Sequence, residues 1–163
     1  MTPVDLTATF EHPPNAWRPA IKLTWYQGAH KPAALSGVDL SGIGHGALFE
    51  GDKGNLVTGF GKHQLHSQPV GDLSDYVPRP KDEQIPPMGG FQQQWINACK
   101  TDRKTSCDMD YSGTAIEQML LGLVAYRVGT KIEYDGKAGR VTNSDEANEL
   151  LSKVYRNGWP LDG

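Results

Sequence analysis

The spacing of apolar residues changes partway along this chain, and that change limits the folds open to it. In residues 4–10 apolar and polar side chains alternate, which is the pattern of a β-strand with one buried face. In residues 116–128 the apolar side chains recur every three or four positions, the spacing of one helix face. Strands that come first and helices that come later are typical of an α+β fold. We therefore expect a mostly antiparallel sheet with helices packed on one face.

The same two patterns predict the remaining elements, which prolines and glycines separate. The expected strands are 4–10, 21–26, 47–50, 55–60, 63–68 and 131–134, and the expected helices are 91–104, 114–128 and a last one from Asn143 or Ser144 to Val154. Thr114 and Glu117 form a capping-box pattern at the start of the middle helix, and Gly129 supplies its end.

Length and charge exclude several classes of protein. The 163 residues predict a single domain spanning 1–163. The formal net charge is -3, so no basic excess points to nucleic acid or to an anionic membrane. No apolar run approaches the roughly 20 residues of a membrane-spanning helix. Two cysteines, Cys99 and Cys107, are too few for a disulfide framework or a four-cysteine zinc site.

Two motifs with possible chemistry lie in the first half of the chain. Residues 42–47 match the G-x-G-x-x-A dinucleotide fingerprint, but that motif requires a strand before it and a helix after it. Here a polar loop precedes the glycines and a short strand follows, which favours a plain glycine loop. His63 and His66 point to opposite faces if 63–66 is a strand, so a zinc site with His45 is the less favoured hypothesis.

Aromatic and acidic side chains give weaker signals. Trp25 and Trp95 fit apolar stripes, which predicts that they lie in the core. Trp17 and Trp159 stand beside prolines, which predicts exposed or half-buried positions. The pair Asp108 and Asp110 precedes the strongest helix, where capping is favoured over binding of a substrate hydroxyl or phosphate.

Several stretches resemble the Gfo/Idh/MocA oxidoreductases of bacteria. Residues 46–54 resemble the family hairpin G-x-L-F-x-G-D-K-G, and residues 94–100 resemble its helix E-W-I-x-A-C-K. The remaining similar stretches, in the order of the family, are 22–28, 107–113 followed by Glu117 and 120–122, then 124–135 and 155–159. The resemblance covers nearly the whole chain. It departs from the family at Gln92–Gln94, where relatives often have His, and at 112–115, where they have Gly-Pro-Leu-Thr.

The resemblance implies a function shared with a second domain. In the family an N-terminal Rossmann domain holds NAD or NADP, and the catalytic Lys and acid–base pair lie upstream of the region matched here. We therefore expect a C-terminal domain that binds a sugar, sugar derivative or polyol, with no cofactor, catalytic residue or metal of its own. In such an enzyme a Rossmann domain would precede the position of Met1, so we expect a piece of a longer protein. Its expected partners are the Rossmann domain and a second copy, which meets the open sheet face.

Polar side chains near strand and helix ends are the candidates for contact with that substrate. They are Tyr26, His45, Asp110 and Tyr111. Two alternatives remain open. A free-standing carbohydrate-binding module would use exposed Trp and Tyr rings, and a small metal enzyme would use His45, His63 and His66.

Overall fold

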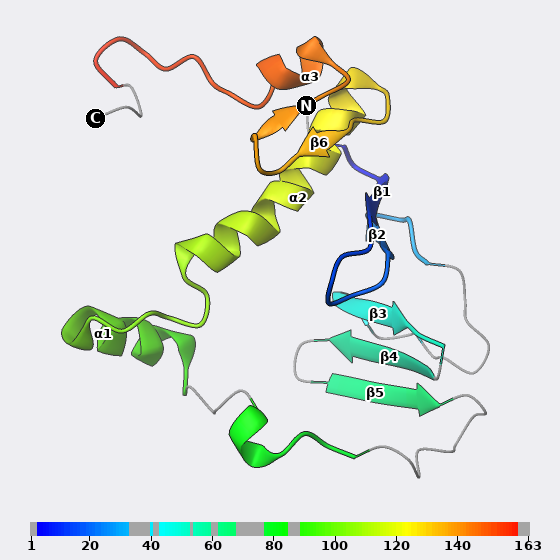
Figure 1. Ribbon diagram of the computed structural model, residues 1–163, viewed down its shortest axis with the longest axis vertical. Coiled ribbons are helices and arrows are strands. Elements are labelled where there is room, and N and C mark those ends of the chain that lie inside the picture. Colours follow the sequence, from blue (N-terminus) through cyan, green and yellow to red (C-terminus); the bar gives the residue numbers. More distant parts are fainter. Residues whose placement is uncertain are drawn as a thin grey trace. The chain divides into compact units, whose positions relative to one another are not determined.

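The computed structural model describes residues 3–32, 40, 43–52, 54–59, 62–67, 77–84 and 89–159 (Figure 1). The chain divides into two compact units, one formed by Met1–His30 with Met88–Gly163 and the other by Lys31–Pro87. Helices and strands are both present, and every described strand pair is antiparallel, so the chain is an α+β mixture. The described strands pair into three small sheets of two, three and two strands, in place of the one sheet that we expected.

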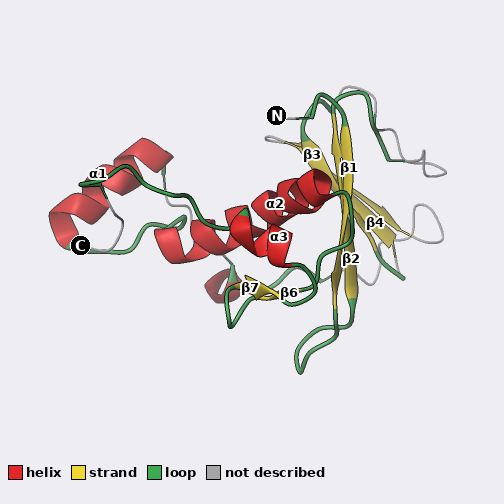
Figure 2. Ribbon diagram, turned by 90° about the horizontal axis from the view of Figure 1, so that it is seen from above, coloured by secondary structure: helices red, strands yellow, loops and turns green. Residues whose placement is uncertain are grey.

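The first unit begins with a hairpin of two seven-residue strands, β1 (Leu6–His12) and β2 (Ile21–Gln27) (Figure 2). Its connection is held by Asn15, whose side-chain oxygen accepts from the backbone N–H of Trp17 at 3.1 Å and of Arg18 at 3.0 Å. Because Phe10 pairs with Leu23 across the ladder, these two side chains share one face of the hairpin. The predicted strands are confirmed here, with β1 shifted two residues along the chain.

The long helix α2 (Met109–Val128) crosses this hairpin at a glycine. A Cβ built on Gly122 would lie 2.9 Å from Phe10 Cζ and 3.5 Å from Ala8 Cβ. Only a residue without a side chain permits this approach without a shift of the ring, because real Cβ atoms essentially never come so close. Gly122 therefore fixes where the helix meets the strand face that carries Phe10.

The start of α2 differs from the prediction. Asp108 is the N-cap, and its side chain accepts from the backbone N–H of Tyr111 at 3.0 Å. Thr114 lies inside the helix, where its hydroxyl donates to the Asp110 carbonyl at 2.9 Å. The capping-box prediction for Thr114 is thus wrong, because an aspartate six residues earlier satisfies the first amides. The predicted end at Gly129 is confirmed, with a left-handed φ of 70°.

Beyond α2 the chain forms the small core of the first unit. The strands β6 (Tyr134–Asp135) and β7 (Arg140–Val141) make a short hairpin, and α3 (Asp145–Glu149) follows, capped by the Ser144 side chain. Val124, Val141 and Ala147 are buried together, with Val128, Ile132 and Tyr134 packed against them. Val141 is 1% exposed.

One side chain joins α3 to β7. The Asn148 amide donates to the carbonyls of Val141 at 2.7 Å and Ser144 at 3.0 Å, and its oxygen accepts from the Val141 N–H at 2.8 Å. Asn148 therefore acts as a strand partner for Val141. These bonds locate α3 on the outer edge of the small hairpin.

The last predicted strand and helix are both shorter than expected. Residues 131–133 are not part of a strand, and α3 ends at Glu149 in place of Val154. The N–H groups of Leu150 and Leu151 bond to carbonyls three residues back, at 3.1 Å each, which tightens the last turn and stops the helix. Val154, expected on the helix, is 96% exposed.

The helix α1 (Phe91–Thr101) precedes α2 and ends at Asp102, which has a left-handed φ of 56°. Lys100 lies in its last turn, whereas Arg103 and Lys104, within the predicted helix 91–104, lie beyond its end. Trp95 is 65% exposed and Trp25 is also exposed, so the prediction that both lie in the core is wrong. Trp17 and Trp159 are exposed, as predicted.

The second unit holds a three-stranded sheet, β3 (Gly46–Glu50), β4 (Gly54–Gly59) and β5 (Lys62–Ser67), in the order β3-β4-β5. These strands match the predicted ones to within a residue. Val57 and Asn55 on the central strand are buried. A single 3-10 turn, Lys81–Glu83, is also described in this unit.

Candidate functional site

A groove of about 530 Å³ runs along α2 in the first unit. Its floor is the helix, and its walls come from the β6–β7 hairpin and from the residues just after α3. The volume lies in the range of small-molecule sites, which is about 300–1,000 Å³. Most of the lining is apolar, and the lining residues are Gly113, Ile116, Glu117, Leu120, Leu121, Leu123, Val124, Tyr126, Arg127, Tyr134, Gly139, Leu150 and Leu151.

The groove exists because α2 is much longer than the elements packed on it. A helix of 20 residues spans about 30 Å, whereas the five residues of α3 span about 7 Å. The short elements cover the part of α2 around Val124 and leave Ile116 and Leu120 more than half exposed. The apolar stripe of the helix thus continues past the small core into solvent.

The main polar feature of the groove is a hydrogen bond between Tyr134 and Glu117. The Tyr134 hydroxyl donates to Glu117 Oε1, linking β6 to the middle of α2. Because the carboxylate accepts this proton, and because partial burial also disfavours the phenolate, the pKa of Tyr134 is raised above its ordinary value. The pair offers one carboxylate to a hydroxyl or ammonium group in the groove.

Charges around the groove are unevenly distributed. Asp145 and Glu146 lie in the first turn of α3, where carboxylates suit the helix dipole, and Glu149 ends the same helix. Arg127 lies in the last turn of α2 and is the lining residue with a positive charge. The α3 carboxylates do not line the groove, so its charged lining residues are Glu117 and Arg127.

Tyr26, one of the four predicted substrate contacts, lies on the hairpin away from this groove. It pairs with Thr7 on β1, and strand alternation puts this pair on the face opposite Ala8 and Phe10, which meet α2. On the same face the Thr7 hydroxyl is 2.7 Å from His30 Nδ1, within hydrogen-bonding distance. Tyr26 therefore neighbours Thr7 and has no contact with the packed face.

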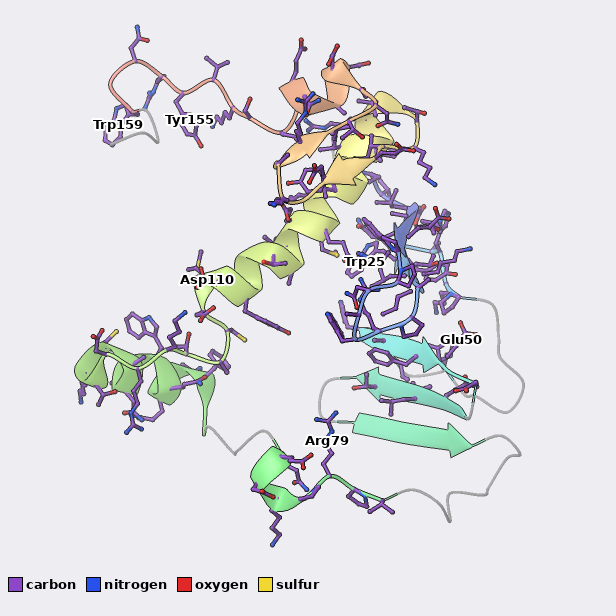
Figure 3. All side chains as sticks on the ribbon, in the orientation of Figure 1. Trp25, Glu50, Arg79, Asp110, Tyr155 and Trp159 are labelled. Atoms are coloured by element: carbon purple, nitrogen blue, oxygen red, sulfur yellow. The ribbon has the colours of Figure 1, made fainter. Side chains whose placement is uncertain are left out.

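Asp110 and Tyr111 lie at the other end of the unit, in the first turn of α2, where Figure 3 labels Asp110. Lys104 Nζ is 3.2 Å from Asp110 Oδ2 and 3.5 Å from Asp108 Oδ2. The Tyr111 N–H bond lowers the pKa of Asp108, and the Asp110 carboxylate raises the pKa of Lys104. The predicted capping role of the acidic cluster is confirmed at Asp108.

Within the first unit, Tyr26 lies apart from Asp110 and Tyr111. Asp110 precedes Gly122 by 12 residues, which is about 18 Å along the helix axis. His45 is exposed just before β3, in the second unit. The glycine run around His45 leads into a strand, as predicted, and not into the helix that a dinucleotide site needs.

Metal ligation finds no support in the described part of the chain. No group of three or more His, Cys, Asp or Glu side chains is arranged there to hold an ion. The side chains of His63 and His66 lie outside the described residues, so the hypothesis that includes them stays untested. Cys99 and Cys107 are both free and exposed.

The contact between Glu117 and Tyr134 was not predicted from the sequence. Glu117 fitted a capping box, and Tyr134 fitted a strand. They are 17 positions apart in the sequence, and the segment between them includes the turn at Gly129 that brings β6 back along α2. A weak signal was present, since Glu117 is a carboxylate beside the apolar stripe of the helix.

Comparison with protein-family models gave no match for this chain, and comparisons with curated proteins and with solved structures gave none either. Among the described residues, no helix combines the length and the apolar character that crossing a membrane demands.

Proposed function

We propose that this chain is the substrate-side and oligomerisation domain of an NAD(P)-dependent oxidoreductase of the Gfo/Idh/MocA type. Its substrate would be a sugar, a sugar derivative or a polyol. The cofactor and the catalytic residues would belong to a Rossmann domain that this domain meets. Hydride transfer is then the chemistry of the nicotinamide, and this domain contributes orientation and closure.

The observation that carries the proposal is the ordered set of family-like motifs. Their residues fall in regular elements: stretch 22–28 supplies most of β2, stretch 46–54 begins with β3, and stretch 94–100 lies within α1. The short stretch 120–122 ends at Gly122, the glycine that meets Phe10. A motif residue with this packing role supports the resemblance more strongly than letters alone.

Exposed apolar surface supports the need for a partner domain. In the described part of the first unit the buried hydrophobic residues are Val124, Val141 and Ala147, which is a small core. Large side chains such as Phe91 and Trp95 are exposed at the same time. A domain that normally meets a neighbour leaves such surface uncovered when it is alone. The open face of the β1–β2 hairpin is the proposed contact with a second copy.

Calorimetry with NAD and NADP tests whether cofactor binding belongs to the Rossmann domain alone. We expect no heat of binding for this chain with either dinucleotide at millimolar concentration. Saturation-transfer NMR with a panel of sugars and polyols should detect weak binding, and a fatty acid of similar size serves as the negative control. Micromolar binding of a dinucleotide would contradict the proposal.

The DNA on the 5′ side of codon 1 provides a second, independent test. We expect an in-frame coding sequence for a strand followed by a glycine-rich turn and a helix, the signature of a Rossmann fold. A stop codon and a ribosome-binding site immediately upstream of Met1 would contradict it.

A carbohydrate-binding module is the alternative function, and the exposure of Trp17 and Trp159 favours it. Aromatic faces of this kind stack on sugar rings. The Arg18 guanidinium lies 5.5 Å from the Trp17 ring centroid and covers one of its faces, which leaves the other face open. Glycan-array binding that is lost in Trp17→Ala or Trp159→Ala, with Trp95→Ala unchanged, would support this alternative. A silent array would exclude it.

A further inference from the structure

Residues 153–159, here called the arm, carry apolar side chains that their own chain leaves uncovered. Val154 is 96% exposed and Trp159 is 72% exposed, and Tyr155 is also exposed. The arm follows Leu150 and Leu151, which line the α2 groove, but it does not enter that groove. Its residues line a separate shallow hollow made of arm residues alone.

The groove and the arm match in size and in apolar character. The groove extends along α2 from Gly113 to Arg127, about 21 Å at the rise of a helix. Seven residues in extended form span about 23 Å. The groove exposes Ile116, Leu120 and Leu150, which are the apolar partners that the rings and methyl groups of the arm lack.

One carboxylate in the groove suits the positive charge of the arm. The arm carries Lys153 and Arg156, and no carboxylate occurs in residues 153–159. The groove offers Glu117 on its floor. Arg127 at the far end is the one like charge that lines the groove, and there the Trp159 ring can accept it as a cation–π partner.

We propose that the arm of one chain lies in the α2 groove of a second copy, and that the exchange is reciprocal. Two aromatic rings and a valine bury on the order of 500 Å² per arm. Two arms and the equal areas of their two grooves then bury on the order of 2,000 Å², the upper end of a standard specific interface. This surface is separate from the β1–β2 face, and the inference does not rest on the proposed function.

Directed cross-linking tests the exchange. In a Cys99→Ser, Cys107→Ser background, one chain carries Leu120→Cys and another carries Val154→Cys. After mixing and mild oxidation we expect at least tenfold more disulfide heterodimer from this pair than from Phe91→Cys with Val154→Cys. Phe91 is a suitable control because it is more exposed than Leu120. Equal yields would overturn the proposal, and so would a double variant of one chain that forms its disulfide only within itself.

Sedimentation velocity provides the second test of the proposal. A chain ending at Ser152 should have a dimer dissociation constant at least tenfold higher than the full chain, and Val154→Asp should reproduce this loss without removing any backbone. Val77→Asp, at another highly exposed valine, should leave the constant unchanged. A full chain that remains monomeric at 200 μM, or a dimer whose constant is the same without the arm, would overturn the proposal.

Discussion

The two ends of helix α2 have the same kind of apolar stripe but very different surroundings. Around Val124 the helix is covered by β1, β7 and α3, and the residues there form the core of the first unit. Toward Met109 the stripe continues through Leu120 and Ile116, yet these side chains are more than half exposed. Periodicity is thus the same at both ends, and burial is not.

The difference shows that a stripe specifies a helix face but not its partner. Gly122 permits the hairpin to approach, and the turn at Gly129 returns the chain so that β6, β7 and α3 can pack. Neither event involves the residues of the N-terminal end. We expect substitutions near the covered end to change stability strongly, and matched substitutions at the open end to have little effect.

The largest effect is expected at Asn148, which bonds to Val141 and Ser144 at the covered end. Asn148→Ala leaves the Val141 N–H and carbonyl without partners, which should cost about 3 kcal/mol of unfolding free energy. Urea unfolding followed by circular dichroism measures it. Asn97→Ala on α1, which removes a bond to Gln93 at an exposed site, should change stability by about 0.5 kcal/mol or less. Equal losses at the two sites would contradict the comparison.

The next effect is expected at the helix glycines. Gly122→Val forces the Phe10 ring to move and should cost about 2 kcal/mol. Gly113→Ala, at a site with nothing within 4 Å of the new methyl group, should instead stabilise the helix by about 0.5–1 kcal/mol. Chemical denaturation of both variants gives the signs. The loss in Gly122→Val should shrink in a Phe10→Ala background, and an unchanged loss there would show that Phe10 is not its cause.

A smaller effect is expected at the N-cap of α3. Ser144→Ala removes the acceptor of the Ala147 N–H bond, at 3.1 Å, and should cost about 1 kcal/mol. Hydrogen exchange of the Ala147 amide detects the loss locally, as a faster rate. Ser144→Gly should cost only a few tenths of a kcal/mol, since glycine is an acceptable N-cap. An Ala147 exchange rate that is unchanged in both variants would contradict the capping role of Ser144.

High pH should weaken the link between Tyr134, which packs on the covered core, and Glu117 in the open part of α2. The pKa of Tyr134 is raised in the fold, so its contribution is complete below the unfolded pKa and disappears as pH rises through the folded pKa. Ultraviolet titration at 295 nm should show a tyrosine that ionises above the ordinary tyrosine pKa. In Glu117→Gln that tyrosine should ionise at lower pH. A titration identical to that of the unaltered chain would contradict the contact.

At the open end, low pH should weaken the cap of α2. The pKa of Asp108 is lowered in the fold, chiefly by the Tyr111 N–H, so the cap stabilises above the unfolded pKa and is lost as pH falls through the folded one. Helicity at 222 nm should therefore fall in acid. Asp108→Asn keeps an acceptor and should flatten this dependence, and an unaltered acid profile in that variant would assign the loss to other groups.

Local patterns predicted much of the secondary structure. Alternation located β1 and β2, turn residues located β3 and β4, and the stripe with Gly129 located the end of α2. The errors have a common cause, which is competition between local signals. Asp108 is the N-cap of α2, although Thr114 and Glu117 match a capping box. A tight turn at Leu150 ends α3 before Val154.

The candidate site was not predictable in the same way. Tyr26, Asp110 and Tyr111 are polar groups near element ends, yet in the first unit Tyr26 lies on the hairpin, whereas Asp110 and Tyr111 share the first turn of α2. His45 belongs to the second unit. The groove depends on how far α3 and β6 reach along α2. That reach follows from the lengths of packed elements and not from a motif.

The sequence by itself determined which segments are strands and helices, because side-chain alternation and helical spacing are local properties of a few neighbouring residues. It also determined that residue 122 has no Cβ and so permits a close approach by another element. Only the tertiary structure decided that Phe10 meets this glycine, that Tyr134 donates to Glu117, and that half of the α2 stripe lies open. Those outcomes join residues far apart in the chain, and their free energy depends on which surfaces come into contact.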